Sequence, residues 1–443
     1  MNITVITCSL SIEQRWAIGA VAGAHDEIDL PVARDPRAKG QAWIPATSLV
    51  GSLRPHLGEA AAQVWLGSAM RDYEDAPRGK DRESTVQAGR LRVLGTRPID
   101  ASPRSRGTTA VNRERGAADA GTLRVEESVE PTEVTLLIEY DGASDAALLN
   151  LLASWRPVIG RGRSSGLGAA RVSDVSSVTL DLNRPEHLTW WLGERTAYLL
   201  GSGGLPEGLE GQRPTAVPSA DSAGPAQDDL VVAMTAVEPI HVGVGDSDEK
   251  VTPLLRREGS SPYIPGSSWK GVFRHRVEFI LDVVGTTDVQ REVIVSALFG
   301  SQQSGRGLLS FGDSVLEISE TQPRTHVAID RFTGGARDGS LFTLDSVPRG
   351  STFMLHIGGA ASIGPVKNLL NHVIRDLSDG LIGVGGHGSR GYGWVARSQD
   401  PPPLAAVDAC ALYAALQQPA QPRPGAGGAQ AGAAQGPNRE VTG

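Results

Sequence analysis

Two glycine-rich segments of this chain carry basic side chains at positions suited to holding phosphate. They read Ile159-Gly-Arg-Gly-Arg-Ser-Ser-Gly-Leu-Gly168 and Ile382-Gly-Val-Gly-Gly-His-Gly-Ser-Arg-Gly-Tyr-Gly393. Glycine lets the backbone approach an anion closely, and the interleaved basic residues add positive charge. These basic residues are Arg161, Arg163, His387 and Arg390. Neither segment ends in Gly-Lys-Ser/Thr, and both follow an expected helix, so P-loop and dinucleotide-binding fingerprints are excluded. A tight structural turn remains the alternative.

A helix start in the second half of the chain is a further candidate anion site. Ser267 and Ser268 precede apolar residues that recur at helical spacing as far as Ile280, which predicts an amphipathic helix with a hydroxyl N-cap. The free amides of its first turn, together with Lys270 and Arg274, would attract phosphate. The alternative is an ordinary capped helix whose basic residues face solvent.

Composition excludes several classes of protein. The 443 residues are 40% hydrophobic and 21% charged, which predicts a folded chain of two to three domains. No apolar run approaches the ~20 residues that span a bilayer, and Met1 to Leu10 lacks the features of a signal peptide, so we expect a cytoplasmic protein without a membrane partner. Only Cys8 and Cys410 occur, which excludes disulfide, thiolate-zinc and iron–sulfur frameworks. A net charge of -8 means that any nucleic-acid surface must be locally basic.

Six short segments recur in the same order in the two halves, at offsets between 217 and 233 residues. The strongest pair is Ile44-Pro-Ala-Thr-Ser-Leu-Val-Gly-Ser-Leu-Arg54 with Ile264-Pro-Gly-Ser-Ser-Trp-Lys-Gly-Val-Phe-Arg274. The others start at Leu30 and Thr252, Trp65 and Leu298, Leu91 and Leu308, Val111 and Ile329, and Gly166 and Gly391. Independent short matches would not keep so constant an offset, so the pattern indicates a duplication.

The order of expected elements predicts an α+β fold of two ferredoxin-like units in tandem. In each half, β-branched strands, expected at 2–9 and 133–140 and at 230–236 and 352–357, alternate with helices such as 145–155 and 365–377, and a glycine loop precedes the last strand. We expect a first domain at 1–178, a connecting segment and linker at 179–229, and a second domain at 230–400. Residues 418–443 are almost all Ala, Gly, Gln and Pro, which predicts a disordered tail.

Taken in order, these motifs resemble those of the RAMP superfamily, and specifically the repeated backbone subunit of type III CRISPR effector complexes, fused in tandem as in type III-D arrangements. The resemblance implies two RRM-like domains that bind guide RNA and target RNA beside other RAMP-type subunits and a large subunit. It places RNA contacts on the glycine loops, on the two helix starts and in a thumb region near Phe332. The residues it marks are Ser48, Arg54, Arg113, Arg161, Arg163, Ser267, Ser268, Lys270, Arg274, Arg331, His387 and Arg390.

The resemblance also implies a catalytic aspartate two positions before the proline of the Asp-x-Pro segment. In the first half this residue is Asp29, which would hold a divalent ion, expected to be Mg²⁺, or assist attack by a 2′-hydroxyl. His25 and Asp26 lie close to it in sequence. The equivalent position in the second half is Val251, which cannot do this chemistry, although Asp246, Asp248 and Glu249 lie just upstream.

The leading hypothesis is therefore that the first half cleaves target RNA and the second half mainly holds RNA. Two alternatives stay open. The first is a purely structural RNA-binding subunit without a nuclease centre. The second is a ribonuclease that processes guide RNA, for which His387 is the one candidate acid or base near a glycine loop.

Overall fold

In the first half of the chain, a central strand, β1 (Asn2–Ile12), pairs on both sides within a four-stranded antiparallel sheet. The computed structural model describes residues 1–443 except 21–27, 37–39, 70–85, 113–116, 119, 144, 207–208, 210–228, 244–250, 256–260, 302, 304, 319 and 418–443. The sheet order is β2-β7-β1-β8, with β2 at Leu91–Thr96, β7 at Thr132–Tyr140 and β8 at Ala170–Asp181. Most residues of β1 are buried, because both faces of the sheet are covered.

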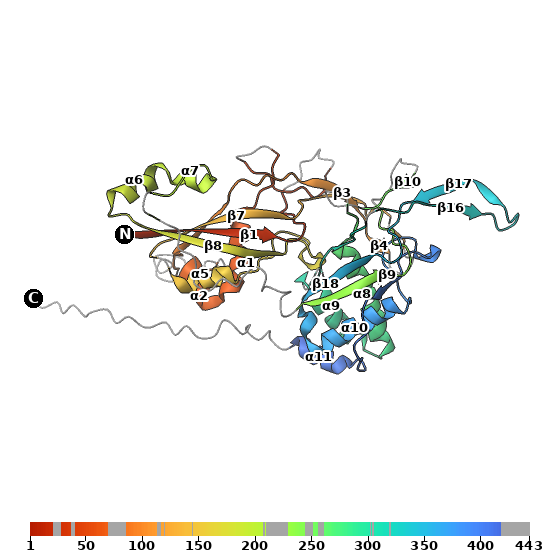
Figure 1. The fold of residues 1–443 in the computed structure, drawn as a ribbon. Coiled ribbons are helices and arrows are strands. Elements are labelled where there is room, and N and C mark those ends of the chain that lie inside the picture. Colours follow the sequence, from red (N-terminus) through yellow and green to blue (C-terminus); the bar gives the residue numbers. More distant parts are fainter. Residues whose placement is uncertain are drawn as a thin grey trace, which may run out of the picture.

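Three helices cover one face of this sheet (Figure 1). They are α1 (Ala46–Leu57), α2 (Glu59–Leu66) and α5 (Ala146–Ala153). Helix α5 begins at the N-cap Asp145, whose carboxylate accepts from two first-turn amides, and it buries Leu148, Leu149 and Leu152 against the sheet. The opposite face is covered by α6 (Pro185–Gly193) and α7 (Arg195–Leu200), where Trp190 packs on Val5 and Leu180. The segment predicted as a connection therefore contributes a second, smaller core.

The second half repeats the same sheet order. Its strands are arranged β14-β18-β9-β19, with β9 at Leu230–Ala236, β14 at Leu309–Phe311, β18 at Thr352–Gly359 and β19 at Val395–Arg397. The helices α8 (Gly266–Val283), α9 (Asp288–Phe299), α10 (Gly364–Ser378) and α11 (Ala409–Gln417) pack on one face around Trp269 and Phe273. The α+β class predicted from the sequence is confirmed, and in the described residues no helix is long and apolar enough to cross a membrane.

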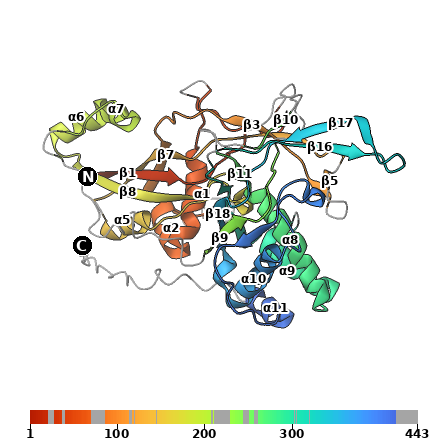
Figure 2. The same ribbon diagram turned by 45° about the vertical axis from the view of Figure 1, so that its right-hand side comes forward.

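A β-ribbon extends from each half. In the first half β3 (Arg104–Thr108) pairs with β6 (Arg124–Ser128), and β4 (Val111–Asn112) with β5 (Ala117–Ala118). In the second half β16 (Arg324–Ile329) pairs with β17 (Ala336–Leu344), and β17 also pairs in parallel with β10 (Val251–Thr252). Figure 2 shows β16 and β17 projecting from the body of the molecule.

Short elements complete the second half and the glycine loops. Strand β11 (Tyr263–Ile264) pairs with β15 (Ser314–Val315), and β12 (Gly300–Ser301) pairs with β13 (Gly305–Arg306). Single 3₁₀ turns lie at η1 (Arg163–Ser165), η3 (Ala360–Ser362) and η4 (Gly388–Arg390). The predicted tail and residues 207–208 and 210–228 of the predicted connecting segment and linker lie outside the described residues.

The start of α8 differs from the prediction. The N-cap is Pro265, not a serine, and the helix begins at Gly266 without a side-chain cap from its own segment. The amide of Gly266 instead donates to Oδ1 of Asp313 at 2.8 Å. Proline in extended conformation can enter a helix directly, and a carboxylate from elsewhere in the fold satisfies the first free amide, so the serine hydroxyls are not needed as caps.

That carboxylate also joins the two halves of the chain. Arg15, from the first half, donates through Nε to Oδ2 of Asp313 at 2.8 Å and is only 5% exposed, while Asp313 is 2% exposed. The Arg15 guanidinium also lies 4.8 Å from the ring centre of Tyr263, whose hydroxyl accepts from Arg106 on β3 at 3.0 Å. A buried ion pair, an aromatic contact and a ribbon therefore meet at one junction.

Loss of Asp313 should destabilise this junction strongly. In an Asp313→Ala variant, Arg15 becomes a buried charge without its partner and the first amide of α8 loses its acceptor, so we expect a cost of about 3–5 kcal/mol in unfolding free energy. Urea denaturation followed by circular dichroism measures this. The matched control is Asp282→Ala, which removes an exposed partner of Arg291 and should cost ~0–1 kcal/mol. Equal effects of the two variants would contradict the role of the buried pair.

Candidate nucleic-acid interface

The two glycine loops adopt the same conformation. Each 3₁₀ turn follows a left-handed residue, Gly162 with φ 68° and His387 with φ 60°, and each ends at a left-handed glycine, Gly166 or Gly391. A Cβ on Gly160 would lie 2.1 Å from the carbonyl oxygen of Ala17, and the same contact recurs at Gly385 with His241. These glycines are required by the turn itself, so any binding function belongs to the side chains between them.

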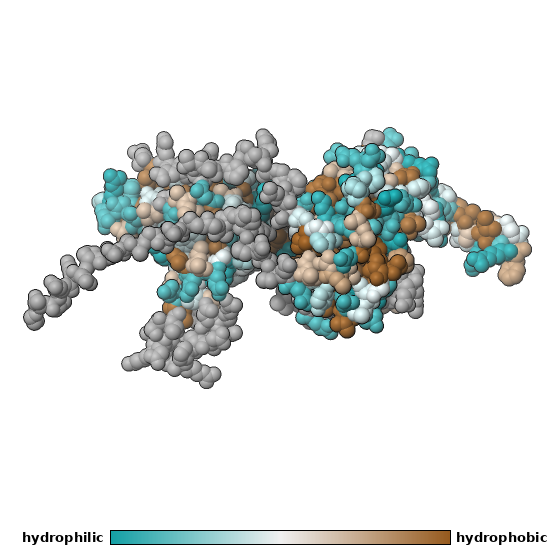
Figure 3. All heavy atoms as spheres, turned by 90° about the horizontal axis from the view of Figure 1, so that it is seen from below, coloured by the Kyte–Doolittle hydropathy of each residue, from teal (hydrophilic) through white to brown (hydrophobic). Residues whose placement is uncertain are grey.

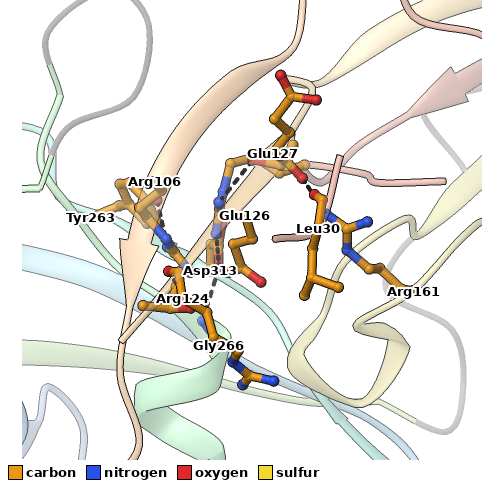
Figure 4. Close-up of polar contacts among 12 residues, drawn as sticks. Leu30, Arg106, Arg124, Glu126, Glu127, Arg161, Tyr263, Gly266 and Asp313 are labelled. Carbon is orange, nitrogen blue, oxygen red and sulfur yellow. Dashed lines mark hydrogen bonds and ion pairs between the residues drawn. The ribbon is translucent and has the colours of Figure 1, made fainter. Parts of the chain in front are cut away.

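Arg161 binds backbone carbonyls of its own half. Its guanidinium donates to the carbonyl oxygens of Leu30, Pro31 and Glu127 at 2.5–3.1 Å (Figure 4). Burial lowers its pKa, and the charges of Glu126 and Glu127 act in the opposite direction. Arg161 therefore fixes the segment that contains Asp29 to the ribbon strand β6.

Arg54 and Arg274, which occupy matching positions in the repeat, also bind backbone. Arg54 donates to the carbonyl oxygen of Gly67 at 2.9 Å, and Arg274 donates to that of Gly300 at 3.3 Å. Each links its helix to the glycine that ends the following helix, and Arg274 also pairs with Glu278. These backbone contacts explain why the arginine recurs in the two halves, and they do so without any contact to RNA.

Three basic residues lie on the segments where the loop of the first half reaches the second half. Lys270 donates from Nζ to the hydroxyl of Ser164 at 2.8 Å, so the first turns of α8 contact η1. Burial lowers the pKa of Arg306, and the like charge of Arg163 lowers it further. We call Arg163, Lys270 and Arg306 the cationic seam. An anion bound there would relieve the repulsion between the two arginines.

The remaining predicted RNA contacts are distributed over three places. Ser48 lies half-buried in α1, whereas Ser267 is exposed and Ser268 half-buried in the first turn of α8. Arg331 is exposed at the tip of the β16–β17 hairpin, next to Phe332, whose side chain is 100% exposed. In Figure 3 this hairpin stands clear of the second half, with polar and apolar side chains along it. Arg113 lies outside the described residues.

Asp29 lies on an exposed loop beside β6. Its amide donates to the carbonyl oxygen of Val125 at 2.9 Å, and its Oδ2 accepts from the Val125 amide at 2.8 Å. In the second half Val251 pairs with Thr343 of β17, the strand that corresponds to β6. The structure thus places Asp29 and Val251 at matching positions. His25, Asp26, Asp246, Asp248 and Glu249 lie outside the described residues.

The surroundings of Asp29 supply few protein ligands for a metal ion. Among the described residues no group of three or more His, Cys, Asp or Glu side chains could hold one. Mg²⁺ in nucleic-acid enzymes is commonly held by one or two carboxylates together with substrate phosphates and waters. A single exposed carboxylate fits that mode of binding and does not fit an ion enclosed by protein alone.

A histidine and aromatic cluster surrounds the second glycine loop, and sequence reasoning found only part of it. His326 and Phe342 are cross-strand partners at the base of the hairpin, and Nε2 of His326 lies 2.7 Å from the hydroxyl of Tyr392. The ring of His387 lies 5.3 Å from that of His241 and 6.4 Å from that of Phe342. The cluster fastens the loop to the hairpin.

Sequence reasoning missed four residues of the junction between the two halves, namely Arg15, Arg106, Tyr263 and Asp313. None lies in a recurring motif, although Tyr263 directly precedes one and Asp313 directly follows one. A comparison of the halves could have drawn attention to Asp313. It follows Gly312, whereas the residue after the matching Gly95 is Thr96, so the carboxylate occurs in one half and not at the matching position of the other.

His387 should titrate below an ordinary histidine. Burial lowers its pKa, and the charges of His241, Arg390 and His326 lower it further, while Nδ1 of His387 lies 2.6 Å from Arg390. We expect NMR titration to place its pKa below 6.5, and Arg390→Ala to raise it by removing a like charge and some burial. The variant Arg375→Ala on α10 serves as control. An unchanged pKa in Arg390→Ala would contradict this account.

Comparison with known proteins gives one match. Residues 233–396 match the family model described as RAMP superfamily, and a search of curated proteins finds no match to the chain. The matched segment begins within β9 and ends within β19, so it contains β14, β18, α8, the hairpin and the second glycine loop. The match supports a RAMP protein and rests on residues 233–396 of the second half.

Proposed function

We propose that this chain is an RNA-binding backbone subunit of a type III CRISPR ribonucleoprotein, built from two ferredoxin-like RAMP units in tandem. The match over residues 233–396 supports a CRISPR-associated RNA-binding role for the second unit. The shared strand order supports a second copy of the unit in the first half, because β2-β7-β1-β8 repeats as β14-β18-β9-β19. Both orders are those of the split βαβ plan.

The cationic seam is the observation that carries RNA binding. Arg163, Lys270 and Arg306 gather positive charge on a chain of net charge -8, where the two units touch. A phosphate backbone would supply an anion to such a cluster, and it needs no base-specific contacts because a guide RNA brings sequence specificity by pairing. The exposed hairpin of the second unit, with Phe332 and Arg331, would then reach the paired strands.

In this proposal the first unit cleaves target RNA and Asp29 acts there. Arg161 holds the Asp29 loop by three backbone carbonyls, and the Val125 amide orients the carboxylate. Asp29 would hold Mg²⁺, which would supply stabilisation of negative charge on the scissile phosphate. The second unit has Val251 at this place and would hold RNA without cutting it. A non-catalytic scaffold is the alternative function.

The proposed partners are guide RNA, target RNA, other RAMP-type subunits and the large subunit of the complex, in the cytoplasm. For the guide-processing alternative, the structure places two further histidines, His241 and His326, near the second glycine loop. However, the Nδ1 atoms of His241 and His387 are engaged with the Asp345 carbonyl oxygen and Arg390, and Nε2 of His326 with Tyr392. We therefore favour the target-cleaving proposal.

Neutralising the cationic seam should weaken guide RNA binding without changing sequence preference. We expect each of Arg163→Ala, Lys270→Ala and Arg306→Ala to lower affinity and to reduce the slope of log affinity against log salt by about 1, because one phosphate contact is lost. Filter binding at several salt concentrations measures this. Lys367→Ala, an exposed lysine of α10, is the matched control. If the three seam variants keep the wild-type slope, the RNA path lies elsewhere.

Cleavage should depend on Asp29. In the complex reconstituted with guide RNA and Mg²⁺, we expect Asp29→Ala and Asp29→Asn each to remove a defined product band while guide binding persists. Denaturing gel analysis of labelled target RNA reports the bands. Asp100→Ala is the control for loss of an exposed loop carboxylate, and Asp246→Ala/Asp248→Ala tests the second unit. Unchanged cutting in every variant would mean that the chain is a scaffold.

A further inference from the structure

Strand β6, which orients Asp29, is held along both of its edges. On one edge β3 pairs with it in antiparallel register. On the other edge, the Val125 carbonyl oxygen accepts from the amide of Asp29, and the Val125 amide donates to the Asp29 carboxylate. A two-stranded ribbon is marginally stable by itself. The position of the Asp29 carboxylate therefore depends on what holds β3 in place.

A tyrosine of the second unit holds β3. Nη1 of Arg106 donates to the Tyr263 hydroxyl at 3.0 Å, and Nη2 donates to Oε1 of Glu126 at 3.1 Å (Figure 4). Arg106 and Glu126 are cross-strand partners in the ribbon, and their side chains are 15% and 24% exposed. One guanidinium thus joins Tyr263 to β6, and the residue of β6 next to Glu126 is Val125, which orients Asp29.

Tyr263 is a fixed point for the ribbon. Its side chain is buried, its backbone pairs with Val315 of β15, and the Arg15 guanidinium lies 4.8 Å from the centre of its ring. Burial raises the pKa of its hydroxyl, while the charges of Arg15 and Arg106 act in the opposite direction. The hydroxyl therefore stays a neutral group that accepts from Arg106.

The second unit holds its own ribbon with a tyrosine from its own glycine loop. Nε2 of His326, at the base of the β16–β17 hairpin, lies 2.7 Å from the Tyr392 hydroxyl. Counted from the recurring motifs, the matching residues of the first unit are Thr108 and Leu167. Leucine has no hydroxyl, so the loop of the first unit cannot make this contact. The first unit instead uses Tyr263, which the second unit supplies.

We propose that Tyr263 is a positioning residue for cleavage by the first unit, an inference that rests on the proposed function of Asp29. The Tyr263 hydroxyl holds Arg106, Arg106 holds Glu126, and β6 then presents the Val125 amide to the Asp29 carboxylate. Because Tyr263 is buried, it acts through the ribbon and not by contact with RNA. The second unit thus completes the cleavage site of the first.

The test measures single-turnover cleavage of labelled target RNA by the complex reconstituted with guide RNA and Mg²⁺. Tyr263→Phe removes the hydroxyl and keeps the ring that Arg15 contacts. At saturating target we expect cleavage about tenfold slower with unchanged target affinity, because a displaced catalytic group lowers the rate without weakening binding. Hydrogen exchange of β6 should become faster. Tyr413→Phe is the control, on α11 at the opposite end of the second unit from β3 (Figures 1 and 2), and should change neither quantity.

A double variant tests whether the hydroxyl acts through Arg106. Arg106→Ala removes the same link from the side of the first unit. If Tyr263 acts through Arg106, the chain with both Tyr263→Phe and Arg106→Ala cuts at the rate of Arg106→Ala alone, whereas independent effects would multiply. Circular dichroism checks that each variant is folded.

Three results would overturn the positioning role. They are wild-type cutting by folded Tyr263→Phe, multiplied effects in the double variant, and a loss of target or guide binding as large as the loss of rate. The last would make Tyr263 a residue of the junction or of the RNA path only. The proposed function fails by a separate result, which is wild-type cutting by Asp29→Asn, and the positioning role then fails with it.

Discussion

The orientation of the two units depends on one buried carboxylate. Asp313 accepts from the Arg15 guanidinium and from the first amide of α8 at the same time, with almost no contact to solvent. Burying both charges is expensive, and the pair is stable because hydrogen bonds satisfy them from both units. This contact places η1 of the first unit against α8 of the second, and thereby brings Lys270 and Arg163 to one seam. The RNA binding proposed at the seam therefore presupposes the ion pair.

Arginine serves two different purposes in this chain. Arg54, Arg161 and Arg274 bind backbone carbonyl oxygens, which a planar group with five donors does well in tight loops. Arg163 also donates to a backbone carbonyl oxygen, that of Gly160 at 2.8 Å, but in addition its charge lowers the pKa of Arg306, a repulsion that a phosphate would relieve. A basic residue in a recurring motif is thus weak support for RNA contact, whereas like charges that influence each other at a junction are stronger support.

The sequence predicted what depends on local pattern. Alternating β-branched residues identified β1, β7, β9 and β18, and the constant offset of the motifs predicted two sheets of like order, because each recurring segment occupies the same element. It could not predict the junction, because Arg15 and Asp313 are 298 residues apart and belong to no periodic pattern. The serine N-cap prediction was wrong for the same reason, since the acceptor for the first amide of α8 comes from a distant strand.

The two halves have diverged where only one of them has a partner. Glycine at the helix start is required where a loop of the other unit arrives, and alanine is found where none does. Arginine and aspartate face each other at the junction, while Pro239 and Thr96 stand at the matching positions. Asp29 and Val251 differ in the same manner, one in each unit at the same place beside a ribbon strand. These one-sided differences lie on elements that the two halves share, so the halves differ in side chains and not in strand order.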